Sequence, residues 1–184
     1  MSFERHPSAN PATAMYEQSL RFTDAALSLF TEAQWLRHEA TNMERTTCVL
    51  YARAGRAALC ALLGANDADL SSAAGTSNLL ELVDALHAQR DPLAANSKDH
   101  ARRLSAVLVM DRADAGRDFV TRELFDRDDV LKCEEGASYM LTACLQRLFG
   151  IDLSKALFLH GASNGGPPFR YFLPRQQDDD DPDT

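Results

Sequence analysis

An alanine-rich stretch with apolar residues at every third or fourth position most constrains how this chain can fold. Residues 42–63 read NMERTTCVLYARAGRAALCALL. The apolar stripe of this stretch is made of Cys48, Ala52, Gly55, Leu59 and Leu62. Such spacing places the side chains on one face of an α-helix, and the many alanines permit a close helix crossing. Thr41 and Glu44 form a capping-box pattern before this helix, and Gly64 supplies a C-terminal stop.

The same periodicity predicts helices along most of the chain, and no region outside the C-terminal arm alternates as a strand does. The other expected helices are Pro11 to about Glu39 capped by Asn10, Leu79 to about Gln89 capped by Asn78, Ser97 to about Ala113, about Asp129 to Phe149 ended by Gly150, and Leu153 to about His160. We therefore predict an all-α fold, a four- to five-helix bundle that occupies residues 10–161.

The first helix needs a face that packs on the others. Its apolar stripe is Phe22, Ala26, Leu29, Ala33 and Leu36. Trp35 flanks this stripe, and we expect its indole to close the core rather than to bind a ligand.

The two ends of the chain differ from the bundle in composition. Residues 1–9 contain no apolar signal-like run, which favours a disordered start and a cytoplasmic protein. Residues 162–175 form an arm rich in glycine, proline and aromatic residues, and residues 176–184 read QQDDDDPDT, which predicts a disordered acidic tail. Nothing in the sequence approaches a run of about twenty apolar residues, so a membrane span is not expected.

The negative net charge argues against non-specific binding of nucleic acid. The net charge is −8, and removing the five aspartates of the tail leaves about −3 on the rest of the chain. Sixteen of the nineteen basic residues are arginine, whose planar guanidinium favours bidentate contacts to phosphate or carboxylate. Arg53 and Arg56 share one side of the second helix, so an anion-binding edge is one interpretation and a salt-bridged surface is the other.

Motifs for familiar chemistry are absent from the sequence. There is no Walker loop, no dinucleotide fingerprint, no nucleophile elbow and no paired Glu-x-x-His motif of a di-metal bundle. Asp84 and His87 alone do not make a metal site, and we expect no metal and no cofactor. The four cysteines form no C-x-x-C pair and lie within apolar patterns, so we expect them to fill the core.

The best catalytic candidates flank the turn between the third and fourth helices. His87 and His100 lie there together with Arg90, Arg102 and Arg103. Folding could combine a general base with phosphate-binding groups at this place, and a hydrated helix–helix corner is the alternative.

The arm after Gly161 is the best candidate for contact with a partner. Phe169, Tyr171, Phe172 and Leu173 give it four large apolar residues in five positions. It either packs on its own bundle or docks on a partner, including a second copy of this chain.

The order of these features resembles the HEPN family of prokaryotic helical domains. The resemblance lies in YARAGRAALCALLGA at 51–65, SNLLELVDAL at 77–86, the polar segment 112–119, and Ala137, Leu141 and Leu145 of the last long helix. It covers about residues 41–150. No arginine in the chain is followed by histidine after four to six residues, which is the motif of the RNA-cutting members.

The resemblance implies a dimeric module that binds a protein partner or a nucleotide, as a regulatory component of a toxin–antitoxin or antiphage conflict system. Arg112 and Arg117 occupy the segment that carries the catalytic pair in HEPN ribonucleases, and phosphate binding there is conceivable, with salt bridges to nearby acids as the plainer interpretation. Two alternatives stay open: a divergent, metal-independent ribonuclease that uses His87 or His100, and a structural accessory protein.

Overall fold

The described part of the chain in the computed structural model consists of residues 11–40, 42–65, 76–89, 93, 96–114 and 125–162. It is all-helical, as the sequence predicts. Its six helices are α1 (Pro11–Glu39), α2 (Glu44–Ala65), α4 (Leu79–Ala88), α5 (Ser97–Asp114), α6 (Arg127–Phe149) and α7 (Leu153–Ala162). The expected disorder at 1–9 and 176–184 and the caps at Asn10 and Thr41 lie outside the described residues. So does the arm predicted at 162–175, except for Ala162, which is the last residue of α7 and not part of an extended segment.

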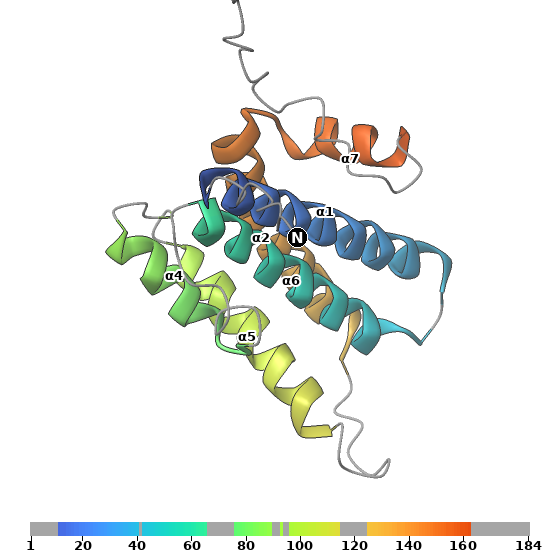
Figure 1. The fold of residues 1–184 in the computed structure, drawn as a ribbon. Helices are drawn as coiled ribbons and strands as arrows, with labels where there is room; N and C mark the ends of the chain where they lie inside the picture. Colours follow the sequence, from blue (N-terminus) through green and yellow to red (C-terminus); the bar gives the residue numbers. More distant parts are fainter. Residues whose placement is uncertain are drawn as a thin grey trace, which may run out of the picture.

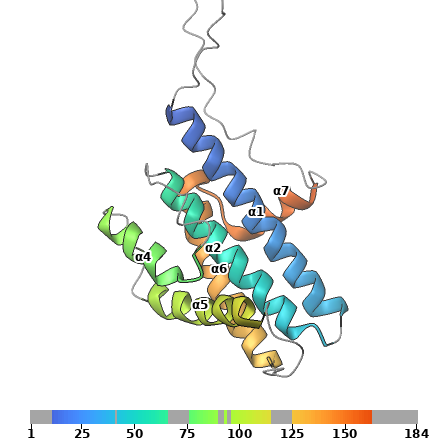
Figure 2. The same cartoon turned by 60° about the horizontal axis from the view of Figure 1, so that its bottom comes forward.

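The second helix, α2, occupies the centre of the bundle (Figure 1). It packs along α1 on one side and along α6, α5 and α4 on the others. α1 and α2 are antiparallel and are joined by a short turn in which Asn42 adopts a left-handed backbone conformation with φ of 60°. α7 lies against the outer side of α1, away from α4 and α5 (Figure 2). α2 is thus the central helix, and α1, α4, α5 and α6 pack around it.

Burial explains why α2 is so apolar. Its segment Glu44–Gly64 is the single stretch among the described residues that is long and apolar enough to cross a membrane, and most of this segment is buried inside the bundle. The alanines and cysteines of α2 therefore face other helices. Phe30 of α1 meets Tyr51 of α2 edge-on, with ring centroids 5.2 Å apart. The four cysteines are all free and buried, as expected.

Two sequence-based expectations are wrong, one about the burial of Trp35 and one about the end of α2. Trp35 is 61% exposed and does not close the core, whereas Leu27 and Phe30 are almost fully buried. The predicted stripe of α1 does face the core, since Ala26 and Ala33 are fully buried and Phe22, Leu29 and Leu36 pack against the buried residues. Gly64 does not stop α2, which continues to Ala65. Tertiary burial of its last turn offsets the low helix propensity of glycine.

At α4 and α6, capping residues mark the ends of the helices. The side chain of Asn78 accepts a hydrogen bond from the Leu80 backbone N–H, as a helix cap should. Asp126 and Asp129 form a capping box that starts α6 two residues before the predicted position. Gly150 ends α6 in the left-handed conformation with φ of 64°, as predicted. At α5, Ser97 is the first helical residue, and the Asn96 carbonyl accepts from the Asp99 and His100 N–H groups.

Candidate functional site

Three arginines gather where α2 packs against the last turns of α5. Arg53 donates to Asp111 over 3.0 Å, and Arg56 donates to the carbonyl of Thr76 over 3.2 Å. Arg112 is exposed on α5, next to Asp111 in the sequence. The structure thus brings together three of the four predicted anion-binding residues. The fourth, Arg117, lies outside the described residues.

The pKa of Arg56 is lowered, in part by the positive charges near it. Burial lowers the pKa of the half-buried Arg56 guanidinium, and repulsion from Arg53 and Arg112 acts in the same direction. Burial and nearby like charges both disfavour the charged form of a basic group. The carboxylate of Asp111 accepts from Arg53 at this place. We call Arg53, Arg56 and Arg112 the arginine edge.

The carboxylate of Glu81 is engaged at the start of α4. Glu81 accepts from the Asn78 side-chain amide over 2.9 Å and from the Thr76 hydroxyl over 3.3 Å. These bonds hold the start of α4 beside the Thr76 carbonyl that Arg56 contacts. The edge therefore has the planar donors that recognise a phosphate, and a scaffold that orients one of them.

The predicted catalytic residues are not joined to one another. His87 is exposed on α4, whereas His100 is only 7% exposed on α5 and stacks on Tyr139 of α6 with ring centroids 5.1 Å apart. Within the described residues no hydrogen bond or ion pair links His87, His100 or Arg103 to another of the three. Arg90 lies outside that part. His100 acts here as a packing residue between α5 and α6.

A polar set that the sequence did not reveal joins α7 to α1. Ser28 Oγ lies 3.3 Å from Nε2 of His160, and Asp24 Oδ1 lies 3.5 Å from Nδ1 of the same ring. The order of atoms is that of a Ser-His-Asp triad, but the distances are long, and Ser28 does not line the cavity found between α5 and α6. The set fastens the last helix to the bundle. Ser28 and His160 are 132 positions apart, so no local pattern could have revealed it.

A second ionic contact ties three helices together. Arg37 of α1 forms an ion pair with Glu134 of α6, and Tyr51 of α2 lies beside them. Burial raises the pKa of the Tyr51 hydroxyl, and Glu134 adds to the rise. This contact is partly buried and joins three helices, so its role is structural.

No site for a metal ion is formed by the described side chains. Among them no group of three or more His, Cys, Asp or Glu is placed to hold a metal ion. Asp84, which stands three residues before His87, pairs instead with Lys98 over 2.7 Å. The aromatic arm residues Phe169, Tyr171, Phe172 and Leu173 lie outside the described part.

Comparison with known proteins adds no relative. No protein-family model, no curated protein and no solved structure matches this chain. The arginine edge is therefore interpreted from its own geometry.

Proposed function

We propose that this chain is a non-catalytic helical binding module that holds the phosphate groups of a nucleotide at the arginine edge. The observation that carries the proposal is the convergence of Arg53, Arg56 and Arg112 from two helices. Guanidinium groups bind phosphate oxygens in pairs of parallel hydrogen bonds. A phosphate there would replace the repulsion that Arg56 feels from its neighbours with attraction.

The wider role rests on the sequence resemblance. We propose that the module is cytoplasmic and homodimeric, and that it is a regulatory component of a prokaryotic or phage conflict system of the toxin–antitoxin or antiphage kind. Its HEPN-like segments support this role, and the lack of the Arg…His pair favours binding over cleavage. A mixed RNA pool should therefore stay intact at high protein concentration, and cleavage abolished by His100→Ala in a folded variant would favour a ribonuclease instead.

Calorimetry with ATP, GTP and inorganic phosphate tests the arginine edge. We expect the triphosphates to bind and Arg56→Gln to weaken them about tenfold or more, since a charge-assisted hydrogen bond contributes about 1.5–3 kcal/mol. Arg21→Gln removes an equal charge from an exposed position on α1 and is the matched control. Binding should also weaken as salt rises.

Two results would reject the edge as a binding site. One is the absence of binding of all three probes at millimolar concentration. The other is an equal loss of affinity in Arg56→Gln and Arg21→Gln, which would point to general charge alone. Should Arg56→Gln unfold, the exposed Arg112→Gln provides the same comparison.

The arm offers a separate mode of binding to a protein partner or to a second copy of this chain. We propose that Phe169, Tyr171, Phe172 and Leu173 supply the apolar contacts of that mode, because four large apolar residues in five positions need a surface to cover them. Deleting 169–173 should lower the mass measured by light scattering or the melting temperature. If neither changes, the arm has no part in assembly.

A further inference from the structure

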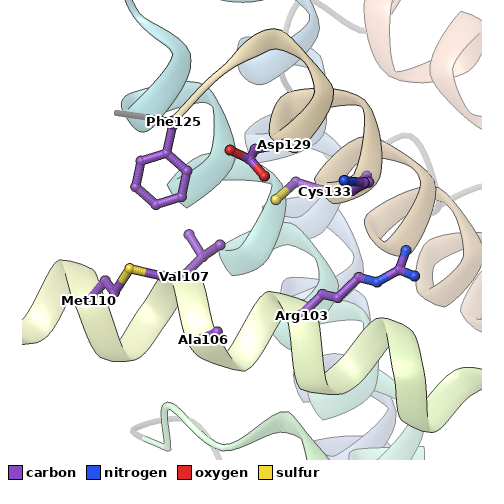
Figure 3. A pocket seen from close by; sticks show the side chains of 8 residues that line it. Arg103, Ala106, Val107, Met110, Phe125, Asp129 and Cys133 are labelled. Atoms are coloured by element: carbon purple, nitrogen blue, oxygen red, sulfur yellow. The ribbon is translucent and has the colours of Figure 1, made fainter. Parts of the chain in front are cut away.

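A cavity of about 280 Å³ opens between α5 and α6, apart from the arginine edge (Figure 3). From α5 it is lined by Arg103, Ala106, Val107 and Met110. Their spacing of three, four and seven places them on one face of that helix. Ala106 has the shortest side chain of the four.

The opposite wall comes from the start of α6. Phe125 lies just before the helix, and Cys133 lies two turns into it. In Figure 3, Phe125 and Met110 lie toward one end of the cavity and Arg103 toward the other. The cavity therefore has an apolar end and a cationic end.

The other charges that line the cavity are already engaged. Asp129 accepts from the Asp126 backbone N–H over 3.1 Å within the capping box of α6. Lys132 pairs with Asp128, one turn back on the same helix, over 2.5 Å. In the described part of the chain no ion pair involves Arg103. Arg103 supplies the charge that is available to a ligand.

Arg103 also acts on the cavity wall. A hydrogen bond with the Cys48 thiol lowers the pKa of Cys133, and the positive charge of Arg103 lowers it further. Arg103 therefore lies close enough to this wall of the cavity for its charge to act on Cys133.

We propose that this cavity binds a small amphipathic carboxylate, with the apolar part against Val107, Met110 and Phe125 and the carboxylate at Arg103. The volume is near the lower end of ligand sites, which hold roughly 300–1,000 Å³. A medium-chain fatty acid or a small aromatic acid is the class that fits. Asp129 opposes an anion in the middle of the cavity, so the carboxylate lies at the Arg103 end.

Calorimetric titration of the full chain with decanoate, and separately with decylamine, tests the polarity of the site. Decanoate should bind at least about tenfold more tightly than the amine, which corresponds to about 1.4 kcal/mol. Arg103→Gln should remove most of this preference. Arg102→Gln is the matched control, because Arg102 is the next residue along α5 and pairs with Asp99 on the exposed surface.

A second variant tests the cavity independently of charge. Ala106→Phe fills the space from a position that already faces it, so decanoate binding should be lost while the helical circular dichroism is unchanged. Decanoate should also slow alkylation of Cys133 by iodoacetamide in the wild-type protein. Tighter binding of decylamine, no binding of decanoate at millimolar concentration, or equal affinity in Arg103→Gln would overturn the proposal.

Discussion

Leu104 of α5 fills a notch above Gly55 of α2. A Cβ atom placed on Gly55 would lie 2.8 Å from Cδ1 of Leu104, which is closer than such atoms approach in proteins. The same leucine methyl would lie 3.4 Å from a Cβ atom on Gly136 of α6. Leu104 is fully buried, so it cannot move away from one glycine without meeting another neighbour. Three helices therefore approach closely at one leucine.

Replacing Gly55 by alanine should lower the free energy of unfolding by about 1 kcal/mol, because overpacking a full core costs about 1–3 kcal/mol and outweighs the gain in helix propensity. In a Leu104→Ala background the same replacement should be stabilising by about 0.5–1 kcal/mol. Urea unfolding of the four proteins in this cycle measures the coupling. An effect of Gly55→Ala that is the same in both backgrounds would show that the notch is not tight.

Ser105→Ala should lower the free energy of unfolding by about 1–3 kcal/mol. The Ser105 hydroxyl accepts the Leu79 backbone N–H over 2.8 Å and donates to the Ala101 carbonyl over 2.6 Å. Its loss leaves a buried N–H at the start of α4 without a partner, which costs about this amount. Hydrogen exchange should show faster opening at Leu79. Ser154→Ala, at an exposed position on α7, is the control and should change stability little.

Helix positions could be predicted from the sequence because the signals that set them are local. The Asn78 cap and its Glu81 partner are three residues apart, and Gly150 follows directly after the helix that it ends. The orientation of a helix is less local. Trp35 lies about 100° from Leu36 around α1, beside the predicted stripe, and periodicity alone could not decide whether such a flanking side chain would be buried.

The candidate site could be predicted only in part. Arg53 and Arg56 lie one turn apart on one helix, so their proximity follows from the sequence. The approach of Arg112 depends on how α5 packs on α2, which is a tertiary property. His100 shows the converse, because its stacking on Tyr139 depends on a contact between residues 39 positions apart. The arginines that follow His100 in the sequence do not indicate that its ring is buried.

Cys133 should be the first of the four cysteines to react with iodoacetamide, since it alone lines the described cavity. Burial raises the pKa of Cys60 to about 11 and of Cys144 to about 12, and the hydrogen bond with Cys133 raises that of Cys48. The hydrogen bond with Cys48, aided by Arg103, lowers the pKa of Cys133 against the opposing effects of burial and Asp129. A thiol with a lowered pKa is ionised at lower pH, so its alkylation rate should rise at a pH below the ordinary value of about 8.5.

Mass spectrometry of short alkylation pulses between pH 6 and 9 measures this order of reaction. Arg103→Gln should shift the midpoint for Cys133 to higher pH and leave the other three cysteines unchanged. Labelling of all four cysteines at one common rate would mean that the label enters through global unfolding, and it would contradict the accessibility assigned to Cys133.

His160→Ala should lower the free energy of unfolding by about 1–3 kcal/mol, within the range of buried side-chain losses, because the ring is only 7% exposed and meets both Ser28 and Asp24. Ser28→Ala should cost less than about 1 kcal/mol, since its hydrogen bond is long and partly exposed to water. Differential scanning calorimetry gives both values. The structural role also predicts that hydrolysis of p-nitrophenyl acetate by the wild-type protein equals that of Ser28→Ala. Hydrolysis that depends on Ser28 would instead make the serine a nucleophile, because only a reacting hydroxyl would separate two proteins of nearly equal stability.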